Sequence, residues 1–208
     1  MNWKTKYGRD WGRLGLRFEL KNIKLGDVCS FYKGVSIPRD RASKYFDIPY
    51  LHYGDIYKKY DLVVDLHKEY KEILKASASE RVRPEQYLRN NDIVYNLTSE
   101  TIDDLGKSVI VKNETNEQFI AGMETTIMRV VNTEAVYPPY LNYVLQTRHF
   151  YNILQQYVTG MKVFRVHPRD ISRLNLLFPS MEIQMFIAAI GDAITERIEL
   201  IKRINQNL

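Results

Sequence analysis

The sequence contains a single cysteine, Cys29, among its 208 residues. One thiol excludes an internal disulfide and a zinc site built from several cysteines. The neighbours Val28 and Phe31 favour a thiol in the core over a nucleophile. The four histidines are scattered, and none pairs with another at metal-ligand spacing. We therefore predict no bound metal, and structural or surface roles for these side chains.

Long apolar stretches are also absent. No run approaches the roughly 18 apolar residues that a membrane-spanning helix needs, and the first residues are charged, unlike a secretion signal. No glycine-rich loop follows a predicted strand, so the usual cradle for a nucleotide or for S-adenosylmethionine is missing. These absences predict a cytoplasmic protein without a membrane segment or a cofactor of its own.

The composition is otherwise that of a folded protein. Hydrophobic residues make up 45% of the chain and charged residues 26%, which supports a core and argues against disorder. The length suits one large domain, or one domain with an appendage. The net charge is +5, and the first 45 residues hold eleven Lys or Arg against four acidic residues. Such a segment is compatible with phosphate contact, but charge alone favours an ordinary solvated surface.

Local patterns predict both strands and helices. β-type stretches bounded by turn residues indicate a strand–turn–strand over 23–37, and strands over 48–53, 92–97, 108–111, 119–122 and 126–131. We expect the last two to pair with each other, and a helix or extended stretch around 68–76. Pro139 suits the first turn of a helix, and apolar residues continue at helical spacing towards Gly160. Residues 1–22 have no clear periodicity, and we interpret them as an N-terminal arm.

The clearest periodicity begins at Met181. Isoleucines recur at steps of three and four, and Arg197 occupies the one polar position of the series. This spacing predicts a coiled-coil seam on a helix of about 27 residues, ~40 Å long. The alternative is an amphipathic helix lying on its own domain, but the length and the β-branched seam favour pairing with a partner helix. The predicted dimerisation residues are Ile183, Ile187, Ile190, Ile194, Ile201 and Ile204.

Three stretches, in this order, are similar to one repeat of the specificity subunit of type I restriction–modification systems. The first is KLGDV at residues 24–28, followed by Gly34. The second is IPYLHYGDI at residues 48–56, which continues into NDIV at 91–94 and LGKSV at 105–109. The third and most specific comprises PYL at 139–141, Gly160, Leu174, FPSMEIQMFIA at 178–188 and Ile194. Two positions depart from the family's pattern: Asn91 replaces the commoner Gly, and Met161 follows Gly160 where members often have Ser.

The resemblance implies an α/β (mixed α+β) target-recognition domain with a twisted sheet, which we assign to residues 23–180. A long C-terminal coiled-coil helix would follow over residues 181–208. It also implies a non-catalytic subunit that binds double-stranded DNA at a specific sequence. Separate methyltransferase (M) and restriction (R) subunits would carry S-adenosylmethionine and ATP. Full-length members join two recognition domains by antiparallel helices, so this chain resembles a half-length subunit, and two copies could pair their helices as a homodimer.

Contacts with DNA phosphates and base edges usually come from Arg, Lys and small polar side chains on loops. Three loops offer such side chains, at residues 33–44, 96–107 and 160–173, and Tyr53 is expected beside them. We expect phosphate contacts from Arg39 and Lys162, and base contacts from residues such as Asn96. The full set of candidate DNA-binding residues is Lys33, Ser36, Arg39, Arg41, Lys44, Tyr53, Asn96, Thr98, Ser99, Lys107, Lys162, Arg165, Arg169 and Arg173.

Other functions stay open at this point. The stretch Tyr137-Pro138-Pro139-Tyr140 resembles the catalytic loop of adenine methyltransferases, but Tyr137 stands where those enzymes have Asn, Asp or Ser. We therefore expect no catalytic residue in this chain. The main alternative is a relic or regulatory recognition cassette that dimerises without productive DNA binding; a monofunctional nuclease or methyltransferase ranks third. A neighbouring methyltransferase gene would favour DNA recognition, whereas failure to bind any DNA would favour the relic.

Overall fold

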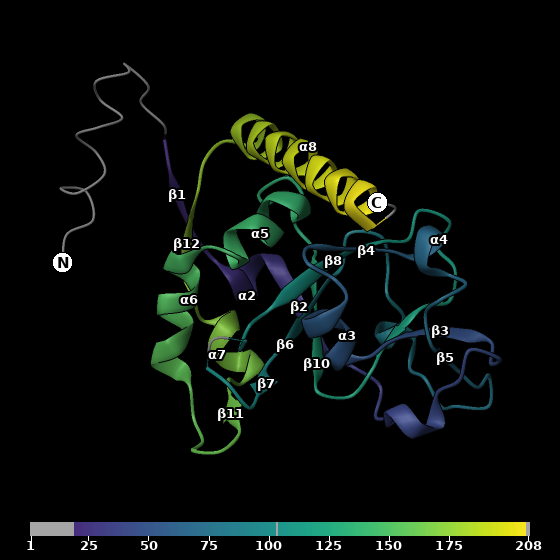
Figure 1. Cartoon of the computed structure of the whole chain (residues 1–208). Helices are drawn as coiled ribbons and strands as arrows, with labels where there is room; N and C mark the ends of the chain where they lie inside the picture. Colours follow the sequence, from purple (N-terminus) through teal and green to yellow (C-terminus); the bar gives the residue numbers. More distant parts are fainter. Residues whose placement is uncertain (1–18, 103, 207–208) are drawn as a thin grey trace.

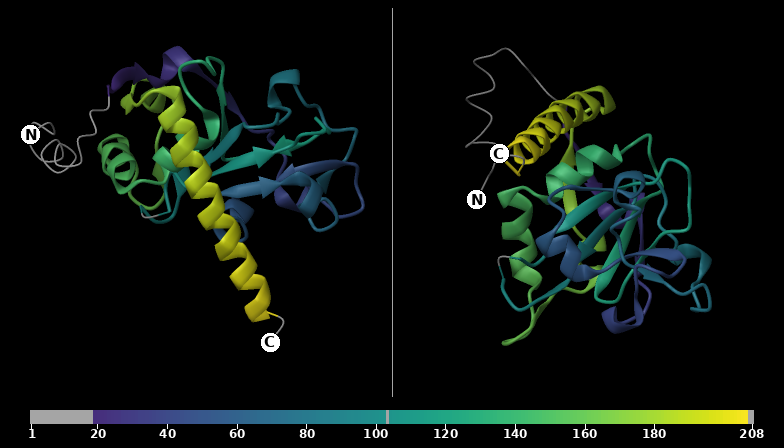
Figure 2. Two further views of the ribbon diagram at one scale, coloured as in Figure 1. Left: turned by 90° about the horizontal axis from the view of Figure 1, so that it is seen from above. Right: turned by 45° about the vertical axis from the view of Figure 1, so that its right-hand side comes forward.

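Helix α8 (Met181–Gln206) runs across one side of a mixed α/β domain (Figure 1). The computed structural model describes residues 19–102 and 104–206. Most of the expected N-terminal arm therefore lies outside the described residues. Figure 2 shows that α8 lies over the domain and then extends beyond its edge. The predicted fold class, a mixed α/β domain with a twisted sheet and a long C-terminal helix, is confirmed.

The remaining elements are short. The strands are β1 (Lys21–Lys24), β2 (Cys29–Lys33), β3 (Ile48–Leu51), β4 (Val63–Asp65), β5 (Lys75–Ala76), β6 (Ile93–Asn96), β7 (Thr98–Ser99), β8 (Ser108–Lys112), β9 (Ile120–Ala121), β10 (Thr125–Val130), β11 (Phe164–Arg165) and β12 (Asn175–Phe178). The helices before α8 are α2 (Leu25–Val28), α3 (Tyr53–Lys58), α4 (Leu66–Glu69), α5 (Pro138–Leu145), α6 (Arg148–Leu154) and α7 (Pro168–Ser172). Single 3-10 turns are η2 (Arg39–Arg41), η3 (Pro84–Gln86) and η4 (Gln155–Tyr157).

A five-stranded sheet in the order β2-β10-β6-β8-β4 forms the centre of the domain. Neighbouring strands are antiparallel except β4 and β8, which are parallel. Successive residues point to opposite faces, so Ile93 and Tyr95 join the core beneath α5, α6 and α7, while Val94 joins a second core with Ile56 of α3. Because both faces are covered, the inner strands are nearly continuous apolar runs, which is why the sequence identified them.

The strands predicted over 92–97, 108–111 and 126–131 are confirmed as β6, β8 and β10. The expected pairing of 119–122 with 126–131 is wrong, because β9 pairs in parallel with β3, and β10 lies between β2 and β6. The short helix α2 separates β1 from β2, and these strands belong to different sheets. The boundary placed at residue 22 thus falls inside β1, which pairs with β12 just before α8.

Two stretches with a helical pattern are each divided into two elements in the structure. The stretch around 68–76, predicted as a helix or an extended segment, contains both, namely the end of α4 and the strand β5. The helical pattern from Pro139 to Gly160 is divided into α5 and α6. Thr147 causes the break, since its side chain accepts a hydrogen bond from the Phe150 amide at 3.2 Å and so caps α6.

The NDIV stretch has a structural role. Asn91 adopts a φ of 67°, a left-handed conformation that Asn tolerates better than most residues, and this explains its replacement of Gly. Asp92 is buried and accepts two hydrogen bonds from Arg129, from Nε at 2.8 Å and from Nη2 at 2.6 Å. The Arg129 guanidinium also lies 5.2 Å from the ring centre of Tyr32. This buried pair connects the start of β6 to β10 and β2.

Candidate nucleic-acid interface

Two of the three predicted loops project at the end of the domain that faces away from α8 (Figure 1). One is a basic lobe, residues 33–44, which contains η2. The other is a finger, residues 159–165, which contains β11 and leads into α7. The candidates on these two loops that are exposed are Lys33, Ser36, Arg39, Arg41, Lys44, Lys162 and Arg165, together with Arg169 on α7. Arg173 lies elsewhere, in an open cavity of about 540 Å³ beside Lys24 and Phe31.

Arg39 is held in position by two side chains from the start of α3. Its Nη1 donates to Asp55 Oδ1 at 3.2 Å and lies 3.1 Å from His52 Nδ1. The same His52 nitrogen accepts the Gly54 amide proton at 3.0 Å, so it carries no proton. Burial, and then the charge of Arg39, lower the pKa of His52, although Asp55 acts in the opposite direction. The Arg39 side chain remains 53% exposed, so its other N–H groups are accessible to a phosphate or a base.

Two other cations of the basic lobe, Arg41 and Lys44, are already paired with acids. Arg41 Nη2 lies 2.6 Å from Glu80 Oε1, and Lys44 Nζ lies 2.6 Å from Glu72 Oε2. The hydrogen bond and the charge of Lys44 lower the pKa of Glu72. The Lys44–Glu72 pair is solvent-exposed and weak, and Arg41 is 62% exposed although its partner Glu80 is only 14% exposed, so a phosphate can reach either cation.

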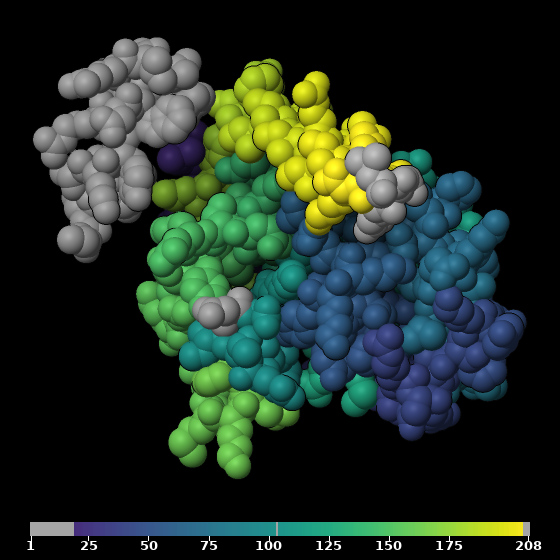
Figure 3. Space-filling view, viewed as in Figure 1, coloured from purple at the N-terminus to yellow at the C-terminus, as the bar shows by residue number. Residues whose placement is uncertain are grey.

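The finger is a small β-ribbon. The backbones of Thr159 and Arg165 exchange two hydrogen bonds of 2.9 Å, and β11 pairs with β7 through Phe164–Ser99 and Arg165–Thr98. Gly160 has a φ of +102°, and a Cβ at this position would lie 2.1 Å from the Val163 carbonyl oxygen. Only Gly fits this turn. Figure 3 shows the finger as a narrow projection from the lower left of the molecule.

The third loop, residues 96–107, does not offer the base contacts that its polar residues suggested. Asn96 is fully buried and its Nδ2 donates to the Tyr53 carbonyl at 3.0 Å, so the prediction that Asn96 contacts a base is wrong. Ser99 is also buried, and its Oγ accepts from the Thr101 amide at 3.2 Å. Lys107 Nζ donates to the Tyr57 carbonyl at 3.0 Å. These side chains instead position α3 and the base of the finger.

Tyr57 completes this connection. Its hydroxyl donates to the Thr98 carbonyl at 2.8 Å, and burial raises its pKa. Thr98 in turn pairs with Arg165, so hydrogen bonds connect α3, β7 and the finger. Tyr57 was not among the residues predicted from the sequence, and neither were His52 and Asp55, which hold Arg39. The Gly54-Asp55 turn could have indicated the start of a helix here. A side chain that accepts a hydrogen bond from a backbone amide two residues later, as His52 does from Gly54, is typical of a helix N-cap.

Helix α8 rests on the domain through its small and polar side chains. Gln184 is buried; its Oε1 accepts from the Tyr137 amide at 2.9 Å, and its Nε2 donates to the carbonyls of Ala135 and Pro179. Further along α8, Gly191 has no side chain, so the ring of Tyr143 can pack against the helix backbone. The Tyr143 hydroxyl donates to Asp192 at 2.8 Å. Near the far end, Lys202 forms an ion pair with Asp61.

The apolar side of α8 faces solvent. Among the predicted seam residues, Ile187, Ile190, Ile194, Ile201 and Ile204 are between 41% and 57% exposed, while Ile183 is less exposed. Phe186, Ile198 and Leu200 extend the exposed apolar surface. The helix therefore does lie on its own domain, as the alternative interpretation held, but it does so without burying the seam.

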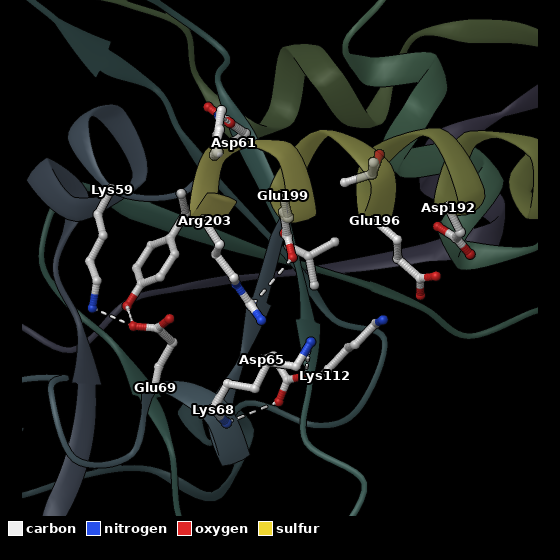
Figure 4. Close-up of a pocket in the computed structure, with 14 residues that line it drawn as sticks. Lys59, Asp61, Asp65, Lys68, Glu69, Lys112, Asp192, Glu196, Glu199 and Arg203 are labelled. Atoms are coloured by element: carbon white, nitrogen blue, oxygen red, sulfur yellow. Dashed lines mark hydrogen bonds and ion pairs between the residues drawn. The ribbon is translucent and has the colours of Figure 1, made fainter. Parts of the chain in front are cut away.

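Between the distal half of α8 and the domain lies a cavity of about 310 Å³ (Figure 4). Its charges pair locally, as in Lys59–Glu69, in Lys68–Asp65 at 3.4 Å and in Arg203–Glu199 at 4.0 Å. Among residues 19–102 and 104–206, no group of three or more His, Cys, Asp or Glu side chains could hold a metal ion. No described helix is long and apolar enough to cross a membrane.

Residues 19–208 match the family described as type I restriction modification DNA specificity domain. This match covers most of the chain, which therefore belongs to that family. No curated protein matches the chain in sequence.

Solved structures agree with this assignment in fold. The chain is similar to the S subunit of a type I restriction-modification system from M. genitalium, with a TM-score of 0.61 at 13% identity, over 92% of this chain and 44% of that one. It is also similar to the HsdS subunit from Thermoanaerobacter tengcongensis, with a TM-score of 0.57 at 17% identity, over 97% and 47%. A chain from a structure of complex assembly and conformational transition of the type I R-M system gives 0.61 at 16% identity, over 97% and 48%. The chain thus spans about half the length of each structure.

Proposed function

We propose that this chain binds a specific double-stranded DNA sequence and directs a methyltransferase subunit, and with it a restriction subunit, to that sequence. The observation that carries the proposal is the pair of basic projections, the basic lobe and the finger, at one end of the domain. Cations on such loops supply affinity for phosphates, and the loops can present side chains to the groove edges. Family membership supports the same function.

The chain itself is proposed to be non-catalytic and to bind no cofactor, with S-adenosylmethionine and ATP on the partner subunits. The Tyr-Pro-Pro-Tyr stretch supports this, because Pro138 begins α5 and the Tyr137 amide is taken by Gln184 of α8. Tyr140 packs against Phe178, with 6.0 Å between the ring centres. A stretch committed to a helix start beneath α8 is not open to a flipped-out adenine.

We further propose that α8 pairs with α8 of a second copy. Its exposed isoleucines lie along one side of the helix, interrupted in the series only by Arg197, and so much exposed apolar surface is costly to leave in water. The contacts of Gln184 and Asp192 with the domain fix the direction of the helix. Antiparallel pairing around a two-fold axis would relate two recognition surfaces, so the DNA target would be palindromic and bipartite, with two inverted half-sites.

The test is to express this chain with and without its candidate methyltransferase partner, and to map adenine methylation across the host genome. The proposal expects a methylation motif that requires both proteins, made of two inverted half-sites with unspecified bases between them. Purified chain incubated with S-adenosylmethionine and DNA should transfer no methyl group. An asymmetric motif would contradict the homodimer, and methylation by the chain alone would contradict the non-catalytic assignment.

DNA binding is tested separately by titrating the purified complex with duplexes that carry the motif. Arg148→Ala is the control for the substitutions Arg39→Ala and Lys162→Ala on the two projections, because Arg148 is exposed on α6 and lies outside both of them. The control should bind as the wild type does. If the wild-type complex binds no DNA at any salt concentration, the relic or regulatory cassette becomes the better explanation.

A further inference from the structure

The finger ends in an apolar side chain that has no packing role. Met161 stands at its tip and is 93% exposed, and Val163 beside it is 40% exposed. The backbone that carries them is constrained, since the Thr159–Arg165 hydrogen bonds close the loop and β11 is paired with β7. A constrained ribbon therefore presents a flexible thioether chain directly to whatever the finger meets.

The surroundings of Met161 are entirely neutral or basic along the chain. From residue 155 to residue 169 the sequence contains no Asp or Glu. Lys162, Arg165 and Arg169 are all exposed on this segment. A projection with this charge is attracted to the phosphates that border a DNA groove, and it would bring its tip to the base edges between them.

We infer that the finger enters the major groove and that Met161 determines specificity by contacting the 5-methyl group of a thymine. This inference rests on the proposed function and names one contact within it. The major groove, about 12 Å wide, accepts a two-stranded β-ribbon, whereas the minor groove is only about 6 Å wide. The thymine methyl is the apolar group that the major groove displays, and a Met side chain adapts easily to such a surface.

Lys162 then has a distinct role from its neighbour. Its ammonium is a point charge that can reach a phosphate at the groove edge while Met161 points inward. Met161 would thus distinguish thymine from other pyrimidines, and Lys162 would add affinity that does not depend on sequence. Substitution of Met161 should therefore change the preference for thymine, whereas substitution of Lys162 should weaken binding to all sequences alike.

The experiment uses the wild-type complex with its methyltransferase partner and duplexes carrying the methylation motif. Each thymine of the half-site is replaced in turn by uracil, which removes only the methyl group. One such replacement should weaken wild-type binding about fourfold, the value of one buried methyl group, and about fifteenfold when made in both half-sites. Met161→Ala should bind the unmodified duplex more weakly by a similar factor, and should lose nothing further when that thymine becomes uracil.

Val131→Ala is the control, because Val131 is 59% exposed and lies in the turn after β10, outside the finger. It should respond to uracil as the wild type does. Met161 is not the contact if no uracil duplex weakens the wild type, or if uracil weakens Met161→Ala equally. A second set of duplexes carries 2-aminopurine in the half-site, a base whose fluorescence rises when it is unstacked. A rise that requires Met161, without any effect of uracil, would also overturn the inference, since it would mean that Met161 inserts between bases. Absence of wild-type binding to the unmodified duplex would overturn the proposed function as well.

Discussion

Replacing three isoleucines on the outer side of α8 should separate the proposed dimer without unfolding the domain. Ile187, Ile194 and Ile201 are 41%, 55% and 57% exposed, so each keeps about half of its surface available for a partner. Full burial of such a side chain is worth about 1.5–3 kcal/mol, so the half that remains is worth about 1 kcal/mol.

The effect on association follows from these values. Three positions in each of two protomers amount to about 6 kcal/mol, which corresponds to roughly a 10⁴-fold weaker dimer. Substitution by Asp adds the cost of placing carboxylates in the seam. The contacts that hold α8 to its own domain come from other side chains, chiefly Gln184 and the Tyr143–Asp192 pair. The fold should therefore survive.

Sedimentation velocity is the assay, with circular dichroism as the measure of folding. The wild type should sediment as a dimer and the variant Ile187→Asp/Ile194→Asp/Ile201→Asp as a folded monomer. Val131→Asp places the same charge on an exposed apolar residue outside α8 and should remain dimeric. A wild type that is monomeric at micromolar concentration would refute the reasoning, and so would a triple variant that still dimerises.

Three further predictions concern single residues. Arg39→Ala and Lys162→Ala should each reduce the salt dependence of DNA binding by about one unit, measured by titration at several salt concentrations; an unchanged slope would mean no phosphate contact. Asp92→Ala should lower the free energy of unfolding by about 3–5 kcal/mol in urea, because Arg129 would be left buried and unpaired; a loss below about 1 kcal/mol would contradict a tight pair. Acidification should destabilise the fold through His52, whose lowered pKa means that the unfolded chain binds the proton more readily. This contribution is complete above pH 6.5, the ordinary value, and is lost as the pH falls from there through the folded-state pKa. His52→Asn keeps a capping acceptor and should lack that part of the pH dependence; an identical pH profile would contradict it.

Some of the candidate site could be predicted from the sequence because it depends on short segments. Exposed basic residues such as Arg39 and Lys162 lie on turns punctuated by Gly and Pro, and turns of this kind run over the surface. The prediction for Asn96 failed because this polar residue is the last residue of the buried strand β6, where the carbonyl of Tyr53, 43 residues earlier, accepts its hydrogen bond. A local sequence pattern shows that a residue is polar, but it does not show which distant segment of the chain packs against that residue in the fold.

The sequence by itself determined the elements whose periodicity is local: the long helix α8 and the apolar strands β6, β8 and β10. Only the tertiary structure decided which side of α8 meets the domain. An amphipathic helix normally buries its apolar face, but here Gln184, Gly191 and Asp192 make the contacts and the isoleucines stay outside. The reason is that α5 and the turn before it offer backbone groups and the Tyr143 hydroxyl beneath the helix, which only polar residues of α8 can satisfy, while Gly191 leaves room for the Tyr143 ring.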